Sequence, residues 1–243
     1  MRHNWKYVVL GISLCSMAFG QGGAITGTVT SAGGAPVSGA TVAYNRLVSY
    51  LPRVGRSVQL APGEVVFGTT STTDATGKHA AQGLPPGNYL VCVDVPAQPL
   101  LDPCRWGPAP PVVQVQAGQT AQLNIPLQSG VFLQVRFNDP LGLLPATQTA
   151  ADIPHVVTGV FAGKGGYLAA SRISVDSSGQ NYRMAIPTGV PLSLWLFSRH
   201  VLLADSAGNA VPAQGSRTPF QASPGVDQVF SVNVTGAAPF QGN

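Results

Sequence analysis

The sequence predicts an all-β protein in which two tandem antiparallel β-sandwich domains follow a signal peptide. Composition is the first observation: 29 Gly and 21 Pro occur among 243 residues, and only 9% of the residues are charged. Long helices need Glu, Lys and Arg for their solvated faces and tolerate Gly and Pro poorly, so this composition favours strands and turns. The second observation is a turn-and-strand pattern in residues 72–95 that recurs in residues 176–196. The third is an N-terminal segment of the kind that directs export.

Residues 1–20 have the composition of a signal peptide. A basic segment that ends at Lys6 precedes an apolar run over residues 7–19, which is shorter than the about 20 residues of a bilayer-spanning helix. Small residues at the end of this segment suit cleavage before Gln21. No later apolar run reaches membrane length. We therefore expect a mature chain without a transmembrane segment, exported to the periplasm, the cell surface or the extracellular space.

The charge of the mature chain argues against a nucleic-acid partner. The sequence has 13 basic and 9 acidic residues, and removal of Arg2 and Lys6 with the leader leaves 11 basic residues and a net charge of +2. Proteins that bind nucleic acid usually concentrate many basic residues on one face. We therefore expect no nucleic-acid partner; the expected partner is an envelope or surface protein, or a carbohydrate.

The pattern in residues 72–95 predicts two turns and three short strands. Asp74 and Gly77 define the first turn, because an Asp side chain caps backbone N–H groups two residues on and Gly accepts a positive φ. Pro85 and Gly87 define the second turn, and alternating apolar residues follow it. The strands predicted for the first domain, residues 23–129, are 24–30, 40–45, 64–70, 78–82, 88–95, 112–116 and 120–127.

The same pattern predicts a second domain over residues 130–236, followed by a C-terminal tail, residues 237–243. Its turns contain Asp176 with Gly179 and Pro187 with Gly189 at the spacing found in the first domain. A second match, between residues 118–127 and residues 225–234, lies further on, and two matches in the same order indicate a tandem repeat. The predicted strands are 131–138, 155–161, 167–175, 181–185, 191–198 and 228–235, with 199–204 as a possible continuation.

Cysteine usage fits an exported protein. Cys15 is removed with the leader, which leaves Cys92 and Cys104 as a pair in a compartment where disulfides persist. A bridge between them would close a short proline-rich loop and contribute about 3 kcal/mol in the chain-entropy description. A lone cysteine pair lacks the further ligands of a zinc site, so we expect a disulfide and no metal.

Four segments of the first domain resemble the carboxypeptidase regulatory-like domain, a transthyretin-like sandwich grouped with carbohydrate-binding-like folds. They are the Asp-x-x-Gly turn at residues 74–77, "ITGTVTSAGGAPVSGATV" (25–42), "LPPGNYLVCV" (84–93) and "VQVQAGQTAQLNIPL" (113–127). In the second domain, of transthyretin-like or Ig-like type, only the hairpin and the last strand are similar. The resemblance implies an exported accessory or binding module without catalytic residues or a cofactor.

The absence of common enzyme signatures also argues against a catalytic function. The sequence has no Gly-x-Ser-x-Gly or His-Glu-x-x-His motif, and Glu64 is its only glutamate. A spatial triad that includes His79, His155 or His200 stays open at this stage. We predict a protein that is not an enzyme, with no catalytic residues.

Two segments are candidates for ligand binding. The segment from Arg46 to Gly63 could engage an acidic or sugar ligand, or it could be a solvated loop packed on the sandwich through its apolar residues. Trp106, beside Arg105, could stack on a sugar, or it could cover the disulfide and the end of the sandwich. The candidate ligand-binding residues are Arg46, Tyr50, Arg53, Arg56, Arg105 and Trp106.

Two functions are compatible with these observations. One is a non-catalytic binding or scaffold protein of the cell envelope that acts through protein–protein contacts at its strand edges. The alternative is a carbohydrate-binding module on the loops of the first domain, which predicts that Trp106, Tyr50 or Tyr44 are exposed together on one face. Trp195 lies in an alternating strand and is expected in the core.

Overall fold

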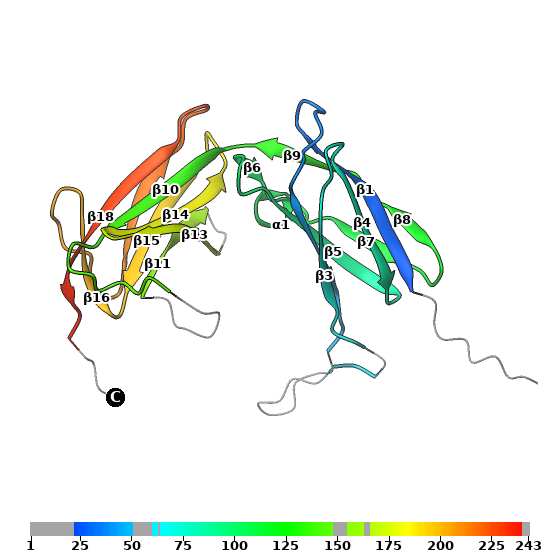
Figure 1. The fold of residues 1–243 in the computed structure, drawn as a ribbon, viewed down its shortest axis with the longest axis horizontal. Helices are drawn as coiled ribbons and strands as arrows, with labels where there is room; N and C mark the ends of the chain where they lie inside the picture. The colour runs from blue at the N-terminus through cyan, green and yellow to red at the C-terminus, as the bar shows by residue number, and fades with distance from the viewer. Residues whose placement is uncertain (1–21, 51–59, 63, 148–154, 163–165, 240–243) are drawn as a thin grey trace, which may run out of the picture.

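The computed structural model describes residues 22–50, 60–62, 64–147, 155–162 and 166–239, which form two β-sandwiches (Figure 1). The predicted signal peptide lies outside the described residues. Two separate hydrophobic clusters form the cores, one from Ile25 to Leu127 and one from Val131 to Val234. No helix among the described residues is long and apolar enough to cross a bilayer.

The N-terminal sandwich contains one sheet in the order β4-β1-β9-β6, with β8 also beside β1, and a second in the order β3-β2-β5-β7. Its strands bury alternate side chains, as in β1, because one face of each sheet packs on the core. The elements are β1 (Gly23–Ser31), β2 (Thr41–Arg46), β3 (Gly68–Thr72), β4 (Lys78–Leu84), β5 (Gly87–Asp94), β6 (Leu100–Leu101), α1 (Pro103–Trp106), β7 (Val112–Val115), β8 (Thr120–Gln122) and β9 (Ile125–Ser129).

The C-terminal sandwich contains one sheet in the order β13-β14-β10-β18-β16 and a second in the order β12-β11-β15-β17. The strands are β10 (Val131–Asn138), β11 (Val156–Ala162), β12 (Tyr167–Ala169), β13 (Ser171–Asp176), β14 (Gly179–Ile186), β15 (Pro191–Ser198), β16 (Val201–Asp205), β17 (Ser216–Gln221) and β18 (Gln228–Ala237).

The two sandwiches share one strand order. In the N-terminal sandwich, the first strand, β1, lies between β4 and β9. In the C-terminal sandwich, the first strand, β10, lies in the same way between β14 and β18. The second sheets correspond as β3-β2-β5-β7 and β12-β11-β15-β17. This correspondence supports the predicted repeat. The division of the chain into domains at residues 23–129 and 130–236 stays a prediction.

The pairing departs from a purely antiparallel arrangement at the first strand of each sandwich. β1 pairs in parallel with β8 and β9, and β10 pairs in parallel with β18. The predicted strand 120–127 is divided in two, because Asn124 turns its side chain back to accept a hydrogen bond from the backbone of Thr28. Leu123 meanwhile donates to the carbonyl of Thr26, so both halves stay beside β1.

Further strand boundaries differ from the prediction, among them β3, which is Gly68–Thr72 where residues 64–70 were predicted. The predicted strand 167–175 is β12 and β13, which belong to opposite sheets because the chain crosses the sandwich at Ala170. Residues 199–204 do not continue β15, since a turn at Arg199 and His200 directs β16 into the other sheet. Such exchanges between sheets leave little trace in local sequence.

The predicted turns at Asp74 and Asp176 have the expected construction. Asp74 accepts hydrogen bonds from the backbone of Thr76 (2.8 Å) and of Lys78 (3.0 Å). Asp176 likewise accepts from the backbone of Ser178 (2.9 Å). These side chains satisfy N–H groups that a tight turn leaves without strand partners, which fixes where each hairpin reverses.

Candidate functional site

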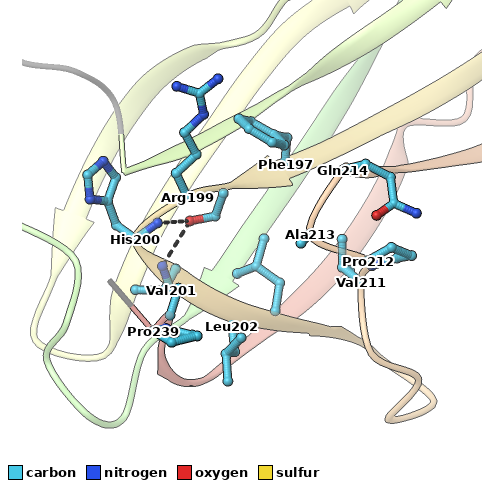
Figure 2. Close-up of a pocket in the computed structure, with 13 residues that line it drawn as sticks. Phe197, Arg199, His200, Val201, Leu202, Val211, Pro212, Ala213, Gln214 and Pro239 are labelled. Atoms are coloured by element: carbon cyan, nitrogen blue, oxygen red, sulfur yellow. Dashed lines mark hydrogen bonds between the residues drawn. The ribbon is translucent and has the colours of Figure 1, made fainter. Parts of the chain in front are cut away.

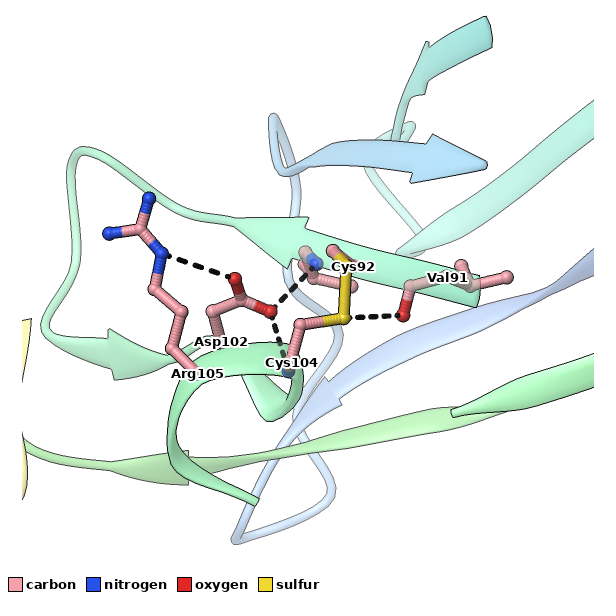
Figure 3. The surroundings of a disulfide bond; sticks show 6 residues. Val91, Cys92, Asp102, Cys104 and Arg105 are labelled. Carbon is pink, nitrogen blue, oxygen red and sulfur yellow. Dashed lines mark hydrogen bonds and ion pairs between the residues drawn. A yellow bond between two sulfur atoms is a disulfide. The ribbon is translucent and has the colours of Figure 1, made fainter. Parts of the chain in front are cut away.

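A disulfide joins Cys92 on β5 to Cys104 on α1, as predicted (Figure 3). Asp102 caps α1 by accepting from the backbone of Cys104 (2.9 Å), and it also accepts from the backbone of Val93 (3.3 Å). Burial raises the pKa of Asp102, and the two backbone hydrogen bonds oppose that rise. The carboxylate and the disulfide together fix α1 against β5.

α1 lies at the joint between the two sandwiches. Trp106 is partly buried and packs against the core of the C-terminal sandwich. Arg105 pairs with Asp102 (3.6 Å) and donates to the carbonyl of Ala169 (3.4 Å). From the other side, Arg183 donates to the carbonyl of Pro96 (2.6 Å). Trp106 and Arg105 therefore contact the neighbouring sandwich, and any ligand-binding role for them stays a prediction.

Gly130 is the one residue between β9 and β10, so a nearly continuous strand passes from one sandwich to the other (Figure 1). A Cβ on Gly130 would lie 2.3 Å from the carbonyl oxygen of Ile186 and 2.7 Å from a methyl group of Leu101. The backbone of Gly130 also donates to the carbonyl of Pro99 (2.7 Å). The joint is therefore packed on both sides of the connection.

The predicted binding loop is anchored to the N-terminal sandwich by Arg46. Its guanidinium pairs with Glu64 (2.9 Å) and donates to the carbonyls of Val65 (2.9 Å) and Pro86 (3.1 Å). The cation is thereby engaged by the protein, which gives Arg46 a structural role. Tyr50 is 56% exposed, and its ligand role stays a prediction. Arg53 and Arg56 lie outside the described residues.

Tyr44 is fully buried, so it cannot share an exposed aromatic face with Tyr50 and Trp106. This corrects the expectation that Tyr44 could belong to an exposed aromatic face that binds carbohydrate. The side chain of Tyr44 points into the core, because it alternates with outward-facing residues along β2. There it contacts the buried His79, which the sequence had left open as a triad member.

A row of aromatic side chains lies on the outer face of the sheet β12-β11-β15-β17. We call it the aromatic face; it consists of Phe161, Tyr167, Trp195 and Phe197. The ring centroids of Trp195 and Phe197 are 6.2 Å apart with planes at 14°, and Phe161 meets Trp195 edge-on at 5.8 Å. Tyr167 lies 5.5 Å from Phe161, and burial raises its pKa to about 12, so its hydroxyl stays protonated near neutral pH.

The expected core position of Trp195 is therefore wrong. Along β15 the buried side chains are Leu192, Leu194 and Leu196, and Trp195 lies between them on the opposite side of the strand. A run that is apolar at every position does not show which side faces the core. The residue opposite Trp195 on β11 is Gly159, where a Cβ would lie 2.0 Å from the carbonyl oxygen of Leu168 on β12.

Two arginines lie on the aromatic face. The guanidinium of Arg217, from β17, is 3.7 Å from the ring centroid of Phe161 and 5.6 Å from that of Trp195. Arg199 lies 5.8 Å from the ring of Phe197. Among the described residues, neither arginine forms an ion pair. These cations are held by ring faces, which attract positive charge without neutralising it.

A groove of about 830 Å³ adjoins the aromatic face at Phe197 (Figure 2). Arg199, His200 and Gln214 are among its lining residues. Ser198 fixes this corner, because its hydroxyl accepts from the backbone of His200 (3.1 Å) and of Val201 (3.0 Å), as the dashed lines show. The groove thus continues from the aromatic face around the end of β15, and most of its other lining residues are apolar.

The sequence contained a partial signal for this surface. Trp195 and Phe197 are two residues apart, so they share a face of any strand that contains them. Arg217 lies opposite Trp195 only because β17 joins that sheet, and β17 was not predicted. The aromatic face was therefore missed because the sheet order, rather than the residue spacing, brings its members together.

Comparisons with known proteins leave the family open. No family model matches the chain. No curated protein matches it. The resemblance to the carboxypeptidase regulatory-like domain therefore stays a prediction.

Solved structures give only distant likenesses. Similar chains include the Bacillus anthracis TIE protein (13% identity, 88% of this chain, TM-score 0.32), a Streptococcal ancillary pilin (13%, 88%, 0.38) and GBS52, the minor pilin of Streptococcus agalactiae (12%, 91%, 0.34). The chain spans 34%, 63% and 100% of their respective lengths. TM-scores of this size do not establish a shared fold, so no property of these proteins is carried over.

Proposed function

We propose that this chain is an exported, non-catalytic scaffold of the cell envelope that acts through contacts with an envelope or surface protein. The joint between the sandwiches carries the proposal. A single residue, Gly130, connects β9 to β10, and Trp106 packs across the joint. Domains that act independently are usually joined by exposed, flexible linkers. A packed connection instead keeps two binding surfaces at a fixed separation, which is what a scaffold requires.

The open edges of the sheets support a protein partner. β3 and β7 end one sheet of the N-terminal sandwich, and β12 and β17 end one sheet of the C-terminal sandwich. Edge strands present unpaired backbone N–H and C=O groups to which a strand of another chain can add. Val65 and Val66, which lead into β3, are 56% and 68% exposed and would be covered by such a strand.

Carbohydrate binding by loops of the first domain has less support. Of its three candidate aromatic residues, Tyr44 is buried and Trp106 packs against the other sandwich. Tyr50 alone is exposed, and a single ring gives little sugar contact area. We therefore favour the scaffold for this domain.

The proposal is tested by loosening the joint while leaving each sandwich intact. A four-residue Gly-Ser insertion after Gly130 would separate β9 from β10, and the same insertion at Gly33, in an exposed turn, is the matched control. Partners would be cross-linked in intact envelopes and quantified by mass spectrometry for the wild type and both variants. We expect the wild type and the control to capture one envelope protein and the joint variant to lose most of it.

Equal capture by the joint variant would reject a scaffold that depends on fixed geometry. Thermal unfolding of both variants shows whether each sandwich is still folded. Reproducible turnover of a substrate by the wild type would reject the non-catalytic assignment.

A further inference from the structure

The aromatic face offers a fixed row of rings for stacking, with Phe161 perpendicular to Trp195. Trp195 and Phe197 are held by one strand with nearly parallel planes, and Phe161 and Tyr167 extend the row across β11 and β12. Gly215 packs against the edge of the Trp195 indole, since a Cβ there would lie 2.5 Å from it. The indole orientation is thus fixed before any ligand arrives, which reduces the entropy lost on binding.

The charged groups on this surface are arginines without acidic partners among the described residues. Arg217 and Arg199 lie over the rings, and the described residues give neither of them a carboxylate partner. By contrast, Arg136, on the opposite sheet, is paired with Asp176 at 2.7 Å. An arginine without a partner presents a planar fork of donors that fits a carboxylate in a bidentate manner.

We propose that the aromatic face binds an acidic oligosaccharide of the uronic acid type. The electropositive C–H face of a pyranose ring would lie on Trp195 and Phe197, whose ring faces carry negative potential. The carboxylate of this sugar would pair with Arg217. The next sugar would pair with Arg199 and extend the oligosaccharide into the groove. There, Gln214 supplies a side-chain amide for hydroxyls, whereas the ring of His200 lies 4.4 Å from that of His155.

Other classes of polymer fit this surface less well. An extended peptide would bind at a sheet edge, where backbone groups are free, whereas the aromatic face lies over the middle strands β11 and β15. Nucleic acid requires a dense basic stripe, whereas this surface has two described arginines. A neutral sugar would stack but would leave both guanidinium groups without a partner.

The inference does not depend on the joint, so it can hold or fail independently of the proposed scaffold. Calorimetric titration of the whole exported protein with tetragalacturonate would measure binding, with cellotetraose as the neutral sugar and poly-L-glutamate as a polyanion without sugar rings. We expect saturable binding of tetragalacturonate and at least about tenfold weaker binding of both comparison ligands.

Substitutions then separate charge from stacking. Arg217→Gln should weaken tetragalacturonate binding about tenfold or more, because it removes the bidentate partner of the carboxylate. Trp195→Ala should weaken it to a similar extent, and Trp195→Phe should restore part of the loss because a ring is retained. Arg183→Gln is the matched control, since Arg183 stacks on Phe132 (4.4 Å) on the opposite sheet; it should leave the affinity unchanged.

Three results would overturn the proposal. One is the absence of binding to tetragalacturonate by the wild type. Another is equal affinity for poly-L-glutamate with no effect of Trp195→Phe or Trp195→Ala, which would indicate unspecific attraction of polyanions. The third is equal affinity for cellotetraose, which would show that the arginines do not recognise a carboxylate. Near-ultraviolet circular dichroism of each variant confirms that a lost affinity is not lost folding.

Discussion

Tyr44 and His79 join the two sheets of the N-terminal sandwich across its core. The Tyr44 hydroxyl lies 2.7 Å from Nδ1 of His79, and Nε2 of His79 lies 3.0 Å from the carbonyl oxygen of Leu123. A carbonyl can only accept, so Nε2 carries the proton and Nδ1 of the neutral ring accepts from Tyr44. The Tyr44 hydroxyl in turn lies 2.9 Å from the hydroxyl of Ser71, which completes the buried chain of polar groups.

This arrangement predicts a loss of stability in mild acid. Burial lowers the pKa of His79 below its ordinary value of 6.5. Above that pH the ring is neutral in both the folded and unfolded states, so it adds no pH dependence. Below it the unfolded chain takes up a proton more readily than the folded one, and the free energy of unfolding falls until the folded pKa is reached. Urea unfolding between about pH 7 and pH 5 measures this slope.

His79→Gln is the control for that slope. The variant should be less stable at neutral pH, because the core loses a ring, and its stability should change less between these pH values. An unchanged slope in the variant would show that another group causes the pH dependence.

Reduction of the disulfide should destabilise the N-terminal sandwich and loosen the joint. The bridge closes a loop with a sequence separation of 12 residues between Cys92 and Cys104. Replacing both cysteines with Ala should cost about 3 kcal/mol in the free energy of unfolding. The fluorescence of Trp106 should also shift as α1 becomes less fixed. Urea unfolding of the wild type with and without reductant, compared with the double variant, measures the first effect.

The double variant contains its own control, because reductant should have no further effect on it. A wild type whose unfolding midpoint is insensitive to reductant would contradict a stabilising role for the bridge.

Gly130→Ala should disrupt the joint through steric overlap. The new Cβ would lie 2.3 Å from the carbonyl oxygen of Ile186, so backbone must move. Overpacking of this kind costs about 1–3 kcal/mol. Gly166→Ala is the matched control, since a Cβ at Gly166 meets nothing within 4 Å. Small-angle scattering and urea unfolding should show a change for Gly130→Ala only; equal behaviour of the two variants would contradict a packed joint.

The sequence predicted the sandwich architecture well because its signals are local. The alternating apolar residues of β1, β5 and β10 correspond to strands with one buried face. The turns at Asp74 and Asp176 were found because Asp and Gly at these positions have specific backbone roles.

The contacts that position the candidate surfaces depend instead on long-range pairing. β6 has two residues and exists only by pairing with β9, and β17 contains a proline and few apolar residues. Trp106 packs on a core from the other half of the chain. No local periodicity encodes such contacts, so neither the joint nor the aromatic face could be predicted.

Gly77→Ala should destabilise the N-terminal sandwich more than a backbone penalty alone explains. Gly77 has φ +73°, and a Cβ there would lie 2.5 Å from the carbonyl oxygen of Val29. The backbone N–H of Val29 also donates to the carbonyl of Gly77 (2.8 Å), so displacement would break a contact between the turn and β1.

Gly34→Ala separates the two effects, because Gly34 has φ +81° with nothing within 4 Å of the added Cβ. Gly34→Ala should cost about 1–2 kcal/mol in the free energy of unfolding, the cost of the left-handed conformation alone. Gly77→Ala should exceed it by at least about 1 kcal/mol, and equal urea midpoints would show that the turn relaxes without disturbing β1.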